Sequence, residues 1–284
     1  MKPARLKDDA FLADVRGAAA RPEELHLWWL GQSGFLLQYR GRHLIMDPYL
    51  SDSLTTKYAA TDKPHVRITE RVVAPERLDF IDVVTASHHH TDHLDPDTLG
   101  PLLRANPSLE LIIPEAIRSF AAERLGIPDS RPTGLNDGES CRAAGFVLHA
   151  LPSAHDTLDT DTAGRHRYLG FVVECGPWLV YHSGDTRRYP GFEERLAAFP
   201  LDVGLLPING WALERRVAGN LSAEEAVEVG LRSRMKLVVP HHYDMFEFNT
   251  ADPAAFEKEA RARGLSFTVL RNGERLTLGN ATMR

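Results

Sequence analysis

The stretch SHHHTDHL, residues 87–94, places four histidines and one aspartate within six consecutive residues. It directly follows the apolar, β-branched run FIDVVTA of residues 80–86, which predicts a buried strand. In an α/β fold, groups just beyond the carboxyl end of a strand face the crevice that binds ligands. Imidazole and carboxylate groups are suitable ligands for Zn, Fe or Mn. The segment therefore predicts a metal site in preference to a histidine-rich surface loop.

The spacing HxHxDH within this segment divides the candidate ligands into two pairs. His88 and His90 can bind one metal ion, and Asp92 and His93 can bind a second. Side chains so close in sequence must point in several directions, so two neighbouring ions are compatible with the pattern.

Three later segments also place a histidine or an aspartate just after a predicted strand. A lone histidine in such a place more often serves a turn, so each segment alone is weak evidence. The ordered set of four segments favours one shared site. The later candidates are His155 in LPSAHD, Asp185 in YHSGDT, and His241 or His242 in VPHHYD.

The remaining pattern alternates β-meanders with β-α units, twice. Helix starts are indicated by Asp95-Pro96, by Pro114, by the capping box of Ser222 and Glu225, and by Asp252-Pro253. This order predicts two mixed sheets packed face to face with helices outside, an α/β sandwich of four layers. The predicted strands cover residues 25–30, 35–39, 43–46, 80–86, 109–113, 144–151, 168–174, 178–182, 203–206, 236–239, 266–270 and 275–278.

The chain contains no Pro/Ser/Gly linker long enough to divide it, so residues 1–284 are expected to form one domain. A helix over residues 4–20 belongs to an N-terminal extension, residues 1–24. The 33 Lys and Arg against 39 Asp and Glu give a net charge of −6. This acidic balance disfavours nucleic acid or an anionic membrane surface as a partner. With no apolar run of membrane-spanning length, a cytoplasmic location is expected.

These motifs resemble those of the metallo-β-lactamase-fold hydrolases, in which HxHxDH is followed by His, Asp and His on later loops. The resemblance extends over nearly the whole chain after residue 25. It implies an αββα sandwich with two divalent metal ions, zinc or manganese, with iron also possible. It implies that Asp47 supports the metal loop without binding metal. The implied ligands are His88, His90 and His155 for one ion, Asp92, His93 and His242 for the other, and Asp185 as the bridge.

Within that family, the sequence is most similar to the L-ascorbate-6-phosphate lactonase group. The resemblance implies that a metal-bound hydroxide attacks a lactone or ester of a small molecule, such as L-ascorbate 6-phosphate. It makes Asp92 the catalytic residue that orients the hydroxide or carries a proton. The residues that carry the similarity are LWWLGQSG at 27–34, YHSGD at 181–185, LPING at 206–210 and VPHHYD at 239–244, continuing to ADP at 251–253.

Substrate contacts are expected from Asn209, Arg187 and Tyr243, and the polar loop of residues 156–167 is a candidate lid. Trp28 and Trp29 are adjacent in a predicted strand and must face opposite ways, so one of them is expected outside the core. The aromatic side chain left outside would suit a homo-oligomer interface.

Two other functions remain open. The first is a metal-dependent phosphodiesterase acting on a lipid or nucleotide, because the same metal core in relatives attacks phosphate esters. The second is a non-catalytic metal-binding protein, although the full set of seven ligands counts against it. A Ser-His-Asp triad is disfavoured because the chain has no GxSxG elbow.

Overall fold

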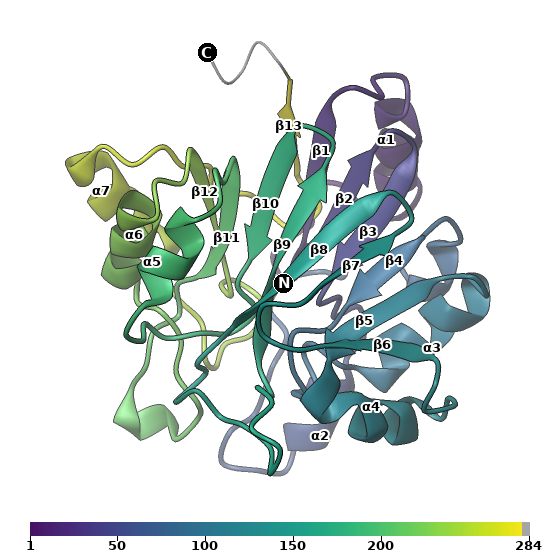
Figure 1. The fold of residues 1–284 in the computed structure, drawn as a ribbon, viewed down its shortest axis with the longest axis horizontal. Helices are drawn as coiled ribbons and strands as arrows, with labels where there is room; N and C mark the ends of the chain where they lie inside the picture. Colours follow the sequence, from purple (N-terminus) through teal and green to yellow (C-terminus); the bar gives the residue numbers. More distant parts are fainter. Residues whose placement is uncertain (280–284) are drawn as a thin grey trace.

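The computed structural model describes residues 1–279, which form two mixed sheets packed face to face with helices on both outer faces (Figure 1). This arrangement confirms the αββα sandwich. The first sheet has the order β13 (Arg275–Leu278), β1 (Leu25–Gly31), β2 (Gly34–Tyr39), β3 (Arg42–Met46), β4 (Val83–Thr85), β5 (Glu110–Pro114) and β6 (Pro132–Leu135). The second has the order β12 (Leu237–His241), β11 (Val203–Pro207), β10 (Trp178–His182), β9 (Leu169–Cys175), β8 (Phe146–Pro152) and β7 (Ser140–Ala143).

Apolar clusters show which helices cover each sheet. The first sheet packs against α1 (Asp8–Ala18), α3 (Pro96–Ala105) and α4 (Arg118–Leu125). The second packs against α5 (Phe192–Ala197), α6 (Ala223–Arg232) and α7 (Pro253–Arg263). The structure confirms three of the predicted helix starts. The Asp95 and Asp252 side chains cap α3 and α7, and Ser222 forms a capping box with Glu225 at the start of α6. The shorter elements are α2 (Ser53–Tyr58), η1 (Pro75–Arg77), η2 (Glu115–Ile117) and η3 (Leu213–Arg215).

Strand β1 is buried on both faces. Its Trp29 packs between the two sheets, whereas Trp28 packs under α1 and donates from Nε1 to Asp14 Oδ2 at 2.8 Å. Both indoles are almost fully buried. The prediction that one of them lies outside the core is wrong, because a sheet in the middle of a four-layer sandwich is covered on both sides.

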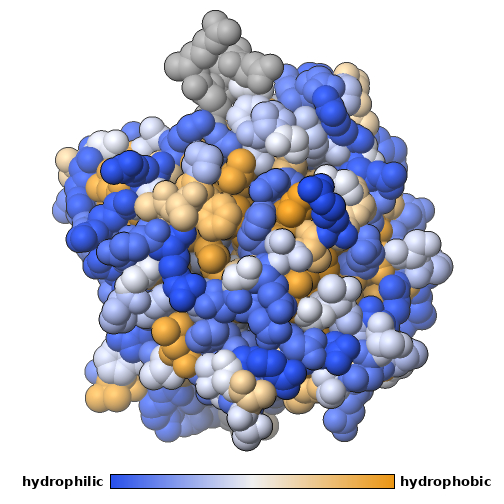
Figure 2. Space-filling view, viewed as in Figure 1, coloured by the Kyte–Doolittle hydropathy of each residue, from blue (hydrophilic) through white to orange (hydrophobic). Residues whose placement is uncertain are grey.

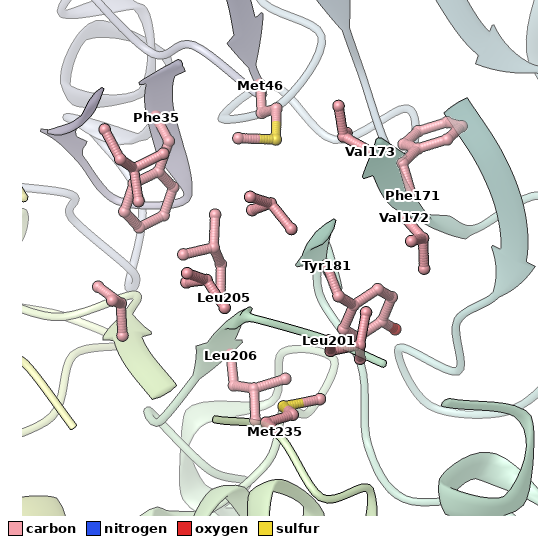
Figure 3. Packing of buried hydrophobic residues seen from close by; sticks show 14 of the residues in the cluster. Phe35, Met46, Phe171, Val172, Val173, Tyr181, Leu201, Leu205, Leu206 and Met235 are labelled. Atoms are coloured by element: carbon pink, nitrogen blue, oxygen red, sulfur yellow. The ribbon is translucent and has the colours of Figure 1, made fainter. Parts of the chain in front are cut away.

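The core between the sheets is filled from both directions. Phe35 and Met46 project from the first sheet towards Val173 and Leu205 of the second (Figure 3). The outer surface seen in Figure 2 is largely hydrophilic. No helix within residues 1–279 is long and apolar enough to span a membrane.

The last third of the chain differs from the sequence prediction at one strand. Residues 266–270 do not form a strand; the structure has one parallel bridge between Val238 and Phe267. Two backbone hydrogen bonds join this segment to Val238, and the chain then leaves for β13 at the edge of the first sheet. Elements α2, α5, β6 and β7 had not been predicted. The single-domain organisation stays a prediction.

Candidate metal centre

The strand directions gather the candidate ligands at one edge of the sandwich. Strands β8 and β10 are each antiparallel to β9, so they run parallel to each other, and β10, β11 and β12 are mutually parallel. The carboxyl ends of β8, β10 and β12 therefore lie at the same edge. The residues that follow these ends include His155, Asp185 and His242. In the first sheet, β4 runs parallel to β3 and leads into residues 87–94.

Three histidines form the first group of candidate ligands. A ring nitrogen from each of His88, His90 and His155 lies within 4.8 Å of the others. His155 Nδ1 lies 2.8 Å from the carbonyl oxygen of Gly219, which orients the ring and leaves Nε2 for the cluster. Among residues 1–279, the buried Nε2 atom of His88 has no hydrogen-bond partner. Such an atom is costly to bury unless a ligand occupies it.

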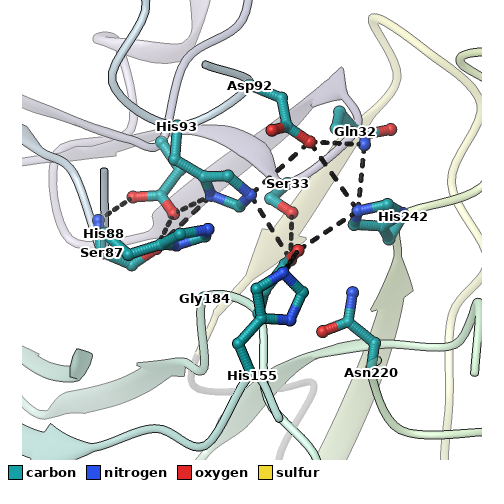
Figure 4. A network of polar contacts seen from close by, with 12 residues as sticks. Gln32, Ser33, Ser87, His88, Asp92, His93, His155, Gly184, Asn220 and His242 are labelled. Carbon is teal, nitrogen blue, oxygen red and sulfur yellow. Dashed lines mark hydrogen bonds and ion pairs between the residues drawn. The ribbon is translucent and has the colours of Figure 1, made fainter. Parts of the chain in front are cut away.

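The Asp185 carboxylate contacts both this group and a second one, to which the Asp92, His93 and His242 side chains labelled in Figure 4 belong. Its Oδ2 is 3.5 Å from His155 Nε2 and 3.4 Å from His242 Nε2. Its Oδ1 is 3.4 Å from His93 Nε2. Asp92 completes the second group, because its Oδ2 lies 3.7 Å from His93 Nε2 and 3.9 Å from His242 Nε2. The structure thus brings all seven sequence-predicted ligands together.

Asp47 supports the segment of residues 87–94 through contacts with Ser87 and His93. It follows β3, is fully buried, and lies 2.5 Å from His93 Nδ1 through its Oδ2. Its Oδ1 accepts a hydrogen bond from the Ser87 backbone N–H at 2.9 Å, and its Oδ2 accepts another from the Ser87 hydroxyl. The carboxylate therefore fixes the start of the 87–94 segment and the orientation of the His93 ring, which is the supporting geometry expected around a metal-binding histidine.

The charges in the cluster fit a bound cation. Burial, followed by the neighbouring rings of His93 and His90, holds the pKa of His88 well below its ordinary value. Burial lowers the pKa of His90 to about 3. Both rings are therefore neutral at pH 7, the form that binds metal. Burial alone would lower the pKa of His93, but the carboxylates of Asp185, Asp92 and Asp47 raise it well above the ordinary value. These three carboxylates thus favour a positive charge among them.

Binding a divalent ion at pH 7 is expected to release about one proton, from His93, because a metal-binding imidazole must be deprotonated. The raised pKa of His93 keeps its ring protonated at pH 7 before the ion binds. Metal affinity should consequently rise with pH until that raised pKa is passed. Titration calorimetry in buffers of different ionisation enthalpy measures the proton.

A matched control is His149→Gln, which removes a histidine that pairs with Glu174 on β9. The number of protons released should not change in this variant. A binding heat that is the same in every buffer would contradict the assigned state of His93.

Two residues at the β1–β2 turn contact the cluster and had no predicted role. The Gln32 amide nitrogen donates to Asp92 Oδ2 at 2.9 Å and lies 3.0 Å from His242 Nε2. Ser33 Oγ lies 3.2 Å from His241 Nδ1 and 3.4 Å from Asp185 Oδ1. His241 is thereby turned towards Ser33, while His242 faces Asp185. The sequence signal was the GQSG turn, which suggested only a tight connection between two strands.

Gly184 allows the close approach of Asp185 to the 87–94 segment. Its φ is +57°, and an added Cβ would lie 2.5 Å from the Ser87 side chain. We expect Gly184→Ala to lower the free energy of unfolding by the roughly 1–2 kcal/mol cost of a left-handed residue, plus about 1–3 kcal/mol for the clash. Urea unfolding measures the total loss in the free energy of unfolding. Gly126→Ala is the matched control, because φ is +64° there with no atom within 4 Å of the new Cβ. Equal losses in the two variants would refute the clash.

A cavity of about 480 Å³ opens onto the cluster. Five of the seven candidate ligands are among the described residues that line it: His90, Asp92, His155, Asp185 and His242. Arg187, Asn209 and Tyr243 are not among the lining residues.

The three candidate substrate residues make other contacts. The Arg187 guanidinium lies 5.5 Å from the centre of the Trp211 ring. Asn209 donates to Asn249, which does line the cavity, at 2.9 Å. Tyr243 is buried and donates its hydroxyl to a backbone carbonyl oxygen. Their contact with substrate, and the role of residues 156–167 as a lid, stay predictions.

Comparison with known proteins supports the fold and identifies the family. A profile described as the beta-lactamase superfamily domain matches residues 26–242. A curated relative from Saccharolobus solfataricus, named a UPF0173 metal-dependent hydrolase, is 26% identical over 256 residues, which are 89% of this chain and 99% of the relative.

Two solved structures share the fold at 18% identity. The isothiocyanate hydrolase from Delia radicum gut bacteria has a TM-score of 0.70, with 88% of this chain and 98% of that chain covered. CmlA, a diiron β-hydroxylase from Streptomyces venezuelae, has a TM-score of 0.66, with 90% and 54% covered. These two structures carry different chemistry on one fold, so similarity to them establishes the fold alone. The profile match, which spans most of the 284 residues, shows that the chain belongs to the beta-lactamase superfamily of metal-dependent hydrolases.

Proposed function

We propose that the protein opens a lactone or similar ester of a small molecule at a centre of two divalent ions, zinc or manganese, with iron also suitable. The observation that carries the proposal is the position of Asp185. Its two oxygens lie within 3.5 Å of imidazole nitrogens from His93, His155 and His242. A carboxylate in that position suits a bridge between one ion held by His88, His90 and His155 and another held by Asp92, His93 and His242.

The residues around the centre divide the chemical work. Bound divalent ions would lower the pKa of a coordinated water and polarise a substrate carbonyl. Asp92 lines the cavity, and the Gln32 amide donates to its Oδ2, so this carboxylate would orient the attacking water and take up its proton. Asp47 keeps His93 aligned throughout.

The size of the cavity supports a small substrate. A volume of about 480 Å³ lies within the range of pockets that enclose drug-sized ligands. The resemblance of the LWWLGQSG, YHSGD and VPHHYD motifs to those of sugar-phosphate lactonases makes L-ascorbate 6-phosphate the first compound to assay.

The test compares two substrate panels on protein loaded with Zn or Mn. One panel contains lactones and simple esters, and the other contains phosphodiesters of lipids and nucleotides. We expect turnover of lactones that disappears after chelation and returns when metal is added back. Turnover of phosphodiesters alone would replace the lactonase with a phosphodiesterase. Metal binding without turnover of either panel would favour a non-catalytic metal-binding protein.

A further inference from the structure

Three cationic side chains line the same cavity as the metal centre. They are Lys57 on α2, Lys63 in the segment that follows α2, and Arg124 on α4. Within the described residues 1–279, none of the three forms an ion pair with a carboxylate. Most other arginines at the surface do have such partners, and the chain as a whole carries a net charge of −6. These three side chains therefore make their part of the cavity lining positively charged, and Asp92 and Asp95 act on Arg124 only at longer range, without an ion pair.

Two of these cations meet at one hydroxyl. Thr91 Oγ1 accepts a hydrogen bond from an Arg124 terminal nitrogen at 2.7 Å and another from Lys57 Nζ at 3.4 Å. Thr91 lies between His90 and Asp92 in the chain. The two cations therefore converge directly beside the metal-ligand segment. Like charges brought this close repel each other unless an anion lies between or beside them.

Arg124 is held in place for such a role. Its other terminal nitrogen donates to the carbonyl oxygen of His89 at 2.7 Å, and the guanidinium lies 5.7 Å from the centre of the Phe120 ring. A guanidinium has five N–H donors in a fixed fork. The two bonds to His89 and Thr91 leave donors for a ligand, and the fork matches the oxygens of a carboxylate or a phosphate. Lys57 is exposed and can adjust to the same ligand.

We propose that Lys57 and Arg124 bind an acidic group of the substrate, a phosphate or a carboxylate, beside the metal centre. Lys63 is left out of the proposed site because its Nζ already donates to the carbonyl oxygen of Arg216. Through these two cations, the site selects anionic lactones or esters over neutral ones. The inference rests on the proposed function for the identity of the substrate, whereas the anion site can be measured without turnover.

The first experiment titrates inorganic phosphate and, separately, acetate into the metal-loaded protein by calorimetry. Both anions also bind metal, so the informative quantity is the difference between variants. In Lys57→Gln, we expect the affinity for the preferred anion to fall about tenfold and its dependence on salt to weaken. The matched control is Lys258→Gln, which removes the same charge from an exposed position on α7 and should leave the affinity unchanged. Equal affinity in the wild type and in Lys57→Gln would overturn the proposal.

Arg124→Lys supplies the second variant, because it keeps the charge and removes the fork. We expect a loss of affinity for the anion, measured together with the melting temperature, since Arg124 also holds the His89 carbonyl. An unchanged affinity in this variant would contradict the role of the fork. The weak 3.4 Å contact of Lys57 makes a folding defect in Lys57→Gln a minor concern.

A turnover assay separates this proposal from the proposed function. Lactones that differ only by an added phosphate or carboxylate are compared, and Lys57→Gln should raise KM for the charged member about tenfold while kcat is retained. Lactone hydrolysis with no preference for the charged member would refute the anion site without contradicting the proposed lactonase activity. Anion binding that depends on Lys57, in a protein that opens no lactone, would support the anion site and refute the proposed lactonase activity.

Discussion

Asp185→Ala is expected to abolish hydrolysis and to release metal. The Asp185 oxygens lie close to His93, His155 and His242, and the side chain is only 4% exposed, so its removal leaves the imidazoles without their shared anion. We expect kcat/KM to fall by at least about 10³-fold, which corresponds to about 4 kcal/mol of transition-state stabilisation. Steady-state kinetics and elemental analysis of the purified variant measure the two effects.

Asp202→Ala is the matched control for this variant. Asp202 is also a buried carboxylate near the second sheet, but it accepts hydrogen bonds from the Leu179 backbone N–H and from Lys236, away from the cluster. Its replacement should lower stability and leave the metal content intact. Turnover and metal content at wild-type levels in Asp185→Ala would refute the proposed bridge.

Asp47→Ala is expected to damage both folding and metal binding. The substitution leaves the Ser87 N–H, the Ser87 hydroxyl and His93 Nδ1 without their acceptor in a fully buried place. Removing one member of a buried charged pair costs about 3–5 kcal/mol of the free energy of unfolding. Loss of a group that orients a metal-binding histidine typically costs about 10–100-fold in metal affinity. Urea unfolding and competitive metal titration measure the two quantities.

Asp82→Ala separates the two effects. Asp82 precedes β4, accepts a hydrogen bond from the His43 backbone N–H at 2.8 Å and pairs with Arg42 at 2.9 Å. Asp82 supports the start of β4, whereas Asp47 supports the segment that follows β4. Asp82 does not contact the cluster, so its loss should reduce stability but not metal affinity. If Asp47→Ala binds metal as tightly as Asp82→Ala does, the supporting role of Asp47 is wrong.

Local chemistry explains why much of this structure could be predicted from the sequence. Caps such as Asp95-Pro96 and Ser222 with Glu225 act within one helical turn, and the structure confirms them. The HxHxDH segment is equally local, since it follows a buried strand whose carboxyl end must face a crevice. The later segments around His155, Asp185 and His242 came from the same rule, and the parallel directions of β8, β10 and β12 bring them together.

The features that were not predicted depend on contacts between distant residues. Gln32 and Asp92, which form a hydrogen bond, are 60 residues apart in the sequence, and Arg124 and Thr91 are 33 residues apart. No local sequence pattern predicts either contact. The burial of Trp28 depends on α1 covering the outer face of the first sheet. Residues 266–270 have the composition of a strand, but the chain's path to β13 leaves them only a single bridge to β12.

The candidate ligands come from both layers of the sandwich: His88 and His93 follow a strand of the first sheet, and Asp185 and His242 follow strands of the second. An ion held by residues from both sheets is therefore a cross-link between distant parts of the chain. A ligand that binds only the folded state stabilises it in proportion to the logarithm of its free concentration. The resistance of the folded protein to heat and to proteases would then increase with the concentration of free metal.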